Sequence, residues 1–539
     1  MRLFVRTALF FLIVFNGCLR AAEYQWSVPM EPTTPEAGKH PRAFLWIPPG
    51  CRRVRAVVLG QQGMLEQGLF DSPIFRQTMS DLDFAIVWVS PGFDPVFRFD
   101  HGAGDRVEAM LKALADVSGY GELAYAPVAP IGDSKSGAFP WNFAAWNPGR
   151  TLAALSIHGG VGGRSAPDLG KQKVDGIPGL IVAYAGEWLF MGSGMDGVTA
   201  FHQKYPNLPL DVLFDDETDA LECPDRLISY LALFLRKAAF ARLPDDVPVD
   251  GPETLKAVDP RRGWLINQWN IQKTPPAPFA DFAGSRDQAW WCFDGEMAWA
   301  AEHFQIPDNR KPEYLGFEQD GAPAKETEVN EILKFEPLPD GITFRVKAAF
   351  LDSVPAGHPL THMQVPAGSH LDHATGGGPV TVSRIAGPVI ETGAGTWAVH
   401  FDRACDATDY EKLTDQIWLL AKQNGDNEYR SAVERASMTI PAHNLQGSDQ
   451  HITFPPIPSQ TNATGSLKLA ASSDSGLPVS YYVREGPAEI EGNTLRFTAV
   501  PPRAKYPIKV TVVAWQYGSP TSPRVKSAEP VTQVITITR

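Results

Sequence analysis

A serine between small residues is the part of this sequence best suited to chemistry. Ser134 lies in the turn Gly132-Asp133-Ser134-Lys135-Ser136-Gly137, which follows an apolar run ending at Ile131 and precedes a predicted helix from Ala138 to Trp146. Small flanking residues let the strand and helix backbones approach closely, which lifts the hydroxyl clear of the sheet edge. The backbone N–H of Lys135 would face a developing oxyanion. The alternative is an ordinary strand-to-helix turn.

This turn resembles the nucleophile elbow of the α/β-hydrolase family, whose usual pattern is G-x-S-x-G. The last small residue here is Ser136, with Gly137 one step later. The resemblance implies a second oxyanion-hole N–H from the loop after an early strand. Gly60-Gln61-Gln62-Gly63 stands there, and the backbone of Gln61 or Gln62 is the candidate, unless this is only a polar loop. Glu66, close by, is either a site residue or an exposed helix residue.

A serine nucleophile needs a base and an acid that orients the base. By the resemblance, the acid position falls on Glu187, whose alternative is a solvated loop glutamate. The histidine position falls within 215–225, where there is no histidine; the register of the final helix puts the missing residue near Ala220. His158, at the end of the strand after the turn, is the nearest candidate base. The expected catalytic residues are therefore Ser134, Glu187 and His158.

Two further clusters could contribute to a site. Histidines at 358, 362, 370 and 373 either fold over the hydrolase mouth or form a polar loop. Five carboxylates between Asp215 and Glu222 could bind calcium, although such a run is more often a solvated loop. No CxxC or His/Cys cluster suggests zinc, and we expect neither a resident metal nor an organic cofactor.

The elements around the serine turn alternate between strands and helices. Strands are predicted at 43–48, 54–59, 84–89, 151–156, 179–184 and 212–214, and helices at 104–120 and 225–242. Apolar strands alternating with amphipathic helices indicate a mostly parallel sheet covered on both faces. The predicted fold class is α/β, with an α/β-hydrolase-like sheet followed by two all-β domains.

The chain of 539 residues is too long for one domain. We expect a signal peptide at 1–22, an α/β-hydrolase-like domain at 23–244, a linker and Trp-rich helical segment at 245–310, a β-rich domain at 311–445 and an immunoglobulin-like β-sandwich at 446–539. In the Trp-rich part, Trp290, Phe293, Met297 and Ala301 recur at helical spacing, typical of a packed helix. An exposed sugar-stacking platform is the alternative.

Export follows from the N-terminus, where Arg2 and Arg6 precede a short apolar run and Ala21 and Ala22. This pattern is typical of a secretory signal and too short for a membrane span, so we expect a periplasmic or extracellular protein. The net charge of −13 argues against nucleic acid as a partner. Four cysteines remain after cleavage, and their spacing fixes no disulfide pairing.

Two functions remain open. One is an exported esterase that acts on polysaccharide-linked esters, in which Ser134 attacks the carbonyl and the amides of Lys135 and Gln61 hold the oxyanion. The other is an inactive hydrolase homologue that binds a glycan or a protein partner. The intact turn favours the first and the missing histidine favours the second. The sequence leaves the oligomeric state open.

Overall fold

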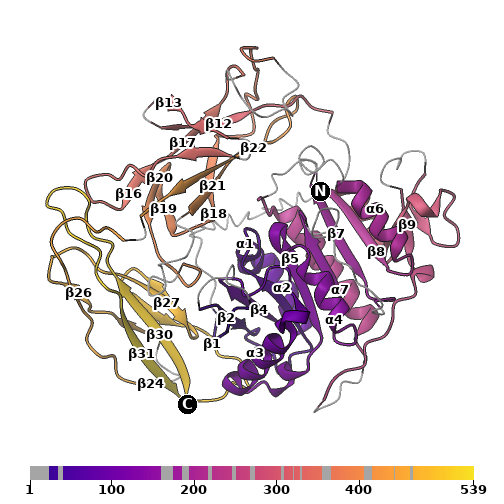
Figure 1. Cartoon of the computed structure of the whole chain (residues 1–539), viewed down its shortest axis with the longest axis horizontal. Coiled ribbons are helices and arrows are strands. Elements are labelled where there is room, and N and C mark those ends of the chain that lie inside the picture. Colours follow the sequence, from indigo (N-terminus) through magenta and orange to yellow (C-terminus); the bar gives the residue numbers. More distant parts are fainter. Residues whose placement is uncertain are drawn as a thin grey trace, which may run out of the picture.

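A computed structural model describes most of the chain. The described residues are 24–33, 40–159, 174–184, 194–215, 221–245, 251–267, 274–304, 309–319, 321–327, 330–354, 366–405, 416–441, 443–461 and 465–539. Figure 1 shows a mixed helix-and-strand part that holds β1 to β8, a β-rich part that holds β12 to β22, and a C-terminal part that includes the long strands β30 and β31. The predicted signal peptide lies outside the described residues.

The N-terminal part contains an eight-stranded sheet of order β1-β2-β4-β3-β5-β6-β7-β8. Strand β2 is antiparallel to β1 and to β4, and the ladders from β4 through β8 are parallel. The strand bounds are β1 Trp26–Pro29, β2 Arg42–Trp46, β3 Ala56–Gln61, β4 Phe84–Ser90, β5 Val128–Asp133, β6 Ala154–Ile157, β7 Gly179–Tyr184 and β8 Leu210–Asp215.

Helices cover both faces of this sheet, and alternate side chains of β3 show how. Val58 packs in one core with residues such as Leu231, whereas Val57 packs in the other core with residues such as Leu111. A period of two along a strand places successive side chains on opposite faces. The helix bounds are α1 Glu66–Asp71, α2 Pro73–Leu82, α3 Ala103–Ser118, α4 Phe139–Trp146, α6 Gly194–Lys204 and α7 Asp225–Arg242.

This strand order, with one antiparallel strand before a run of parallel strands, is an α/β-hydrolase fold. The predicted fold class is therefore confirmed. Helix α7 has the bounds that its apolar spacing predicts, and β7 does too. Strand β6 begins later than predicted, because Thr151 forms only an isolated bridge with Val128.

The Trp-rich segment folds differently from the prediction. Trp290 lies in the short strand β11 (Trp290–Cys292), which pairs with β9 (Trp264–Ile266). Strand β10 (Ala277–Pro278) pairs with the other edge of β9. Helix α8 begins only at Gly295 and ends at Phe304. The prediction of one helix carrying Trp290 was wrong, because a run of three apolar residues fits a strand as well as a helix.

Several small, mainly antiparallel sheets follow, and we call the part that spans 311–445 the β-domain. Its largest sheet has the order β14-β15-β22-β21-β18. The strand bounds are β12 Leu315–Gln319, β13 Ala322–Pro323, β14 Lys325–Glu326, β15 Glu331–Leu333, β16 Thr343–Arg345, β17 Lys347–Phe350, β18 Thr381–Ala386, β19 Val389–Gly393, β20 Thr396–Val399, β21 Gln416–Gln423 and β22 Ala432–Thr439.

The last part of the chain is also built of strands, and its main sheet has the order β24-β31-β30-β27. The bounds are β23 Ile452–Thr453, β24 Gln460–Thr461, β25 Ser466–Lys468, β26 Ser472–Ser473, β27 Ser480–Glu485, β28 Ala488–Glu491, β29 Thr494–Phe497, β30 Ile508–Trp515 and β31 Val531–Thr538.

Within the described ranges, none of the helices has the length and apolarity needed to cross a bilayer. The cysteines at 51, 223, 292 and 405 are all free thiols.

Candidate active site

The turn after β5 has the geometry expected of a nucleophile elbow. Ser134 is exposed and adopts a positive φ of 46°, which is uncommon for a residue with a side chain. A Cβ on Gly132 would lie 2.0 Å from the carbonyl oxygen of Ser136, and one on Gly159 would lie 2.6 Å from that of Ser134. The backbone around the turn is therefore so tightly packed that glycine is required within β5, at Gly132, and just after β6, at Gly159. Ser134 directly follows the carboxyl end of β5.

His158 lies beside this serine on the neighbouring strand. Asp133 pairs in register with Ile157, so Ser134 and His158 are the first residues after the ends of two adjacent parallel strands. The backbones of such strands lie about 5 Å apart. His158 is buried, has a positive φ of 48°, and its backbone N–H donates to Val182. The strand register thus places the backbones of two of the three expected catalytic residues next to each other; the role of each side chain stays a prediction.

The loop after β3 lies next to the serine turn, because Gly60 pairs in register with Ile131 of β5. The Gln62 backbone N–H donates to the Val89 carbonyl at 2.7 Å. The buried Gln61 side chain accepts from the Phe93 and Asp94 amides and donates to the Asp94 carbonyl. Its side chain therefore fastens β3 to the segment after β4, and the proposed oxyanion role of its backbone stays a prediction.

Glu66 is not an exposed helix residue. Its side chain is buried, and its carboxylate accepts from the Gly63 N–H at 2.8 Å and from the Asp133 N–H at 3.0 Å. Burial raises the pKa of this carboxyl to about 7, although the surrounding backbone amides lower it. The sequence left Glu66 open between two roles, and its contact with the residue before Ser134 places it at the site.

More carboxyl groups gather at this edge of the sheet. Burial, together with the charges of Asp133, Glu222, Glu66 and Asp215, raises the pKa of the Cys223 thiol. A thiol in such surroundings stays protonated at neutral pH, so it is a poor nucleophile. Cys223 lies just before α7, and its protonated thiol cannot act as a base.

Two of the other expected positions, Glu187 and Ala220, lie outside the described residues. Most of the acidic run between Asp215 and Glu222, which could bind calcium, lies outside them too. The two described ends of that run pair with cations: Asp215 with Arg226 at 2.7 Å, and Glu222 with Lys422. Within the described part of the chain, no three His, Cys, Asp or Glu side chains are grouped to hold a metal.

The β-domain reaches the loops around the serine turn. Ser90 donates to the Gln62 side chain at 2.9 Å and to the Ala404 carbonyl at 3.4 Å, and Arg384 donates to the Gln67 side chain at 3.4 Å. Lys422 of β21 makes the ion pair with Glu222. The three contacts made by the β-domain join residues 200 or more positions apart, and no local pattern in the sequence signals them.

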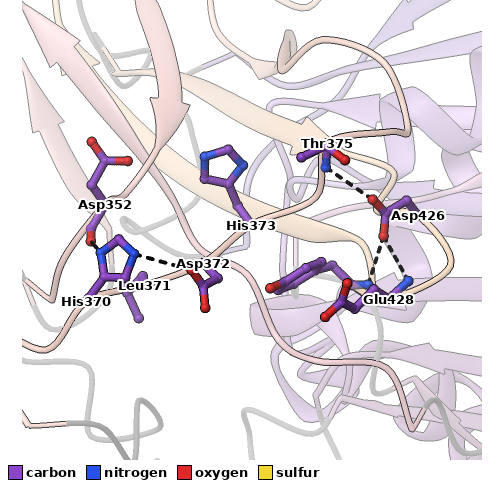
Figure 2. A pocket seen from close by; sticks show the side chains of 9 residues that line it. Asp352, His370, Leu371, Asp372, His373, Thr375, Asp426 and Glu428 are labelled. Carbon is purple, nitrogen blue, oxygen red and sulfur yellow. Dashed lines mark hydrogen bonds and ion pairs between the residues drawn. The ribbon is translucent and has the colours of Figure 1, made fainter.

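The two described histidines of the later cluster lie in a different place. Figure 2 shows His370 and His373 in a pocket of about 310 Å³ whose lining comes only from the β-domain. The His370 ring contacts the Asp352 carbonyl at 3.0 Å and Asp372 at 3.3 Å. Asp426 accepts from four backbone N–H groups, which lower its pKa to about 2. His358 and His362 lie outside the described residues.

No family model and no curated protein matches this sequence. Similar solved structures include S-formylglutathione hydrolase from Agrobacterium tumefaciens, with 13% identity, 40% of this chain and 94% of that chain covered, and a TM-score of 0.29. Siderophore hydrolase EstA from Aspergillus nidulans has 12% identity, with coverages of 42% and 98%, and a TM-score of 0.31. An esterase from Pyrobaculum calidifontis has 16% identity, coverages of 40% and 85%, and a TM-score of 0.28. The fold assignment rests on the strand order instead.

Proposed function

We propose that this protein is an esterase of the α/β-hydrolase type, with Ser134 as its nucleophile. The observation that carries the proposal is the exposed Ser134 at positive φ on the carboxyl end of β5. Its Oγ attacks the ester carbonyl, the alcohol leaves, and water then hydrolyses the acyl-serine. The Lys135 and Gln61 backbone N–H groups are the proposed oxyanion donors, and Glu187 is the proposed acid.

The base in this proposal is His158. It stands next to Ser134 across the β5–β6 ladder, and the loop between Asp215 and Asp225 carries no histidine. A base supplied from this strand differs from the family arrangement, in which the histidine follows the last strand. We therefore expect turnover below that of an enzyme with the family arrangement. Removing the base altogether, as in His158→Ala, commonly costs about 10⁴-fold to 10⁶-fold in rate.

The substrate and location also belong to the proposal. Cleavage of the predicted signal peptide at 1–22 would place the enzyme in the periplasm or outside the cell, where polysaccharide esters are accessible. The proposed domains are the hydrolase at 23–244, the Trp-rich segment at 245–310, the β-domain at 311–445 and an immunoglobulin-like module at 446–539. Appended β-modules support a polymeric substrate by analogy alone.

The test is turnover of an activated aryl ester and labelling of the mature protein by a fluorophosphonate. We expect slow turnover and slow labelling, both absent in Ser134→Ala and in His158→Ala. His101→Ala is the matched control, because the His101 side chain is 55% exposed and lies 3.7 Å from Asp100. Labelling that persists in Ser134→Ala would overturn the proposal. Activity retained in His158→Ala would remove His158 as the base.

The second candidate function is that of an inactive homologue that binds a glycan or a protein partner. The missing histidine in the loop before α7 is the observation that favours it. In that case the wild-type protein shows no labelling, and Ser134→Ala leaves the affinity for an oligosaccharide unchanged. The pocket in Figure 2 is a place where such a ligand could be sought.

A further inference from the structure

The Glu66 carboxylate touches both segments from which the proposed oxyanion hole would be built. One oxygen accepts from the N–H of Gly63 in the loop after β3, and the other accepts from the N–H of Asp133, which directly precedes Ser134. Glu66 is only 1% exposed. A Cβ on Gly63 would come within 2.6 Å of the carboxylate, so a glycine is what lets the loop approach it.

The sheet itself explains why this contact is needed. The ladder between β3 and β5 ends at the pair Gly60 and Ile131, whereas β5 continues to Asp133. Asp133 lies two residues beyond that pair, and its N–H donates to the Glu66 carboxylate at 3.0 Å. A buried amide without an acceptor is costly. Glu66, at the first position of α1, supplies that acceptor from the side chain.

We propose that Glu66 is a positioning residue that holds the loop after β3 in register with the Ser134 turn, and so fixes the distance between the two oxyanion donors. A single planar carboxylate that bonds both backbones leaves neither free to move without breaking a hydrogen bond. The catalytic part of this inference rests on the proposed function, whereas the structural clamp does not.

The cost of this arrangement supports a role beyond stability. Burial disfavours the charged form of Glu66 and raises its pKa to about 7, so its folded environment is an expensive place for a carboxylate. A buried Glu122 elsewhere in the same domain makes a comparable contact: it accepts from the Val54 N–H at 3.0 Å, near Arg503. Glu122 lies in the turn Gly121–Ala124 before β5, at the end of that strand opposite to Ser134, and provides a matched control.

The experiment compares Glu66→Gln with Glu122→Gln in the full mature protein. Glutamine keeps the shape of the side chain, but it has only one acceptor oxygen. Its NH₂ group would face one of the two backbone N–H groups that donate to the carboxylate in the wild type. Hydrogen exchange followed by mass spectrometry should show about 10-fold faster exchange in the peptide containing Gly63, in the one containing Asp133, or in both. The peptide containing Val54 should be unchanged. Glu122→Gln should show the reverse pattern.

Kinetics on an activated ester then tests the catalytic part. Outright removal of an oxyanion donor costs roughly 10²-fold to 10³-fold in kcat, so a loosened pair should cost about 10-fold. We expect kcat to fall in Glu66→Gln with KM nearly unchanged, and neither to change in Glu122→Gln.

Unchanged exchange at both segments would overturn the clamp. Altered exchange with an unchanged kcat would overturn its catalytic role. If the wild type shows no Ser134-dependent turnover, the proposed function fails while the exchange result still decides the clamp.

Discussion

At the scale of single residues, the α/β-hydrolase domain tolerates carboxyl groups in unusually apolar places. Asp211 on β8 is fully buried; it accepts a hydrogen bond from the Tyr230 hydroxyl at 2.7 Å and contacts the Cys292 sulfur at 3.8 Å. Burial raises the pKa of Asp211 to about 7. Since no cation is among these contacts, Asp211 is held by neutral donors, and its ionisation should weaken the folded state.

We predict that Asp211→Asn becomes more stable relative to the wild type as the pH rises. The folded-state pKa of Asp211 lies above the unfolded value of about 3.8, so its contribution is fully present below pH 4 and is lost as the pH rises through 7. The unfolding free energy of the variant, relative to that of the wild type, should rise between pH 5 and pH 8 by at most about 3 kcal/mol. Urea denaturation at both pH values measures this.

The control for that experiment is Asp245→Asn, because the Asp245 side chain is fully exposed. Its unfolding free energy should follow the wild-type pH dependence closely. The same pH dependence in Asp211→Asn as in the wild type would show that Asp211 does not hold its proton in the folded protein.

At the scale of elements, the serine turn could be predicted and its surroundings could not. The apolar run before Gly132 and the small residues around Ser134 are local signals, and both the strand and α4 form where they indicate. His158 was placed by strand order alone. The role of Glu66 could not be predicted, because the local sequence around a glutamate does not show which group its carboxylate contacts. Here the donor is the backbone N–H of Asp133, which lies 67 positions later in the chain.

We predict that Gly132→Ala disrupts the turn, whereas Gly68→Ala on α1 does not. The new methyl group at 132 would meet backbone of Ser136 at 2.0 Å, whereas one at 68 meets nothing within 4 Å. Overpacking against backbone commonly costs about 1–3 kcal/mol or more, and Gly132→Ala should also abolish Ser134 labelling. Gly68→Ala should be neutral or stabilising by up to about 1 kcal/mol. Unfolding free energies and fluorophosphonate labelling measure both; a Gly132→Ala variant that labels normally would contradict the elbow geometry.

At the scale of the whole molecule, the three parts in Figure 1 contact one another directly. Glu485 of the C-terminal part pairs with Arg42 at 3.1 Å, and Arg503 pairs with Glu122 at 3.0 Å. Trp515 packs against Phe401 of the β-domain, with ring centroids 4.8 Å apart. The sequence predicts separate β-modules. It does not predict that these modules pack against the rest of the chain, because the contacts join residues that are far apart in the sequence.

The ion pair between Lys422 and Glu222 joins the β-domain to the loop before α7, and its removal tests that docking. The Glu222 side chain is 9% exposed and that of Lys422 is 32% exposed. Breaking a fully buried pair costs about 3–5 kcal/mol. Since Lys422 is partly solvated, we expect Lys422→Ala to lower the unfolding free energy by only about 1–2 kcal/mol. Adding Glu222→Gln should recover part of this loss, because it removes the buried charge left without that cation.

Lys311→Ala is the matched control, because Lys311 and its partner Glu428 are both about 60% exposed. An exposed pair contributes little, so the unfolding free energy of this variant should stay close to that of the wild type. Equal losses in the two lysine variants would mean that the Lys422 contact is no more than a surface ion pair. A larger loss in Lys422→Ala, partly recovered in the double variant, would mean that the β-domain and the hydrolase domain stabilise each other at the edge of the sheet that carries Ser134.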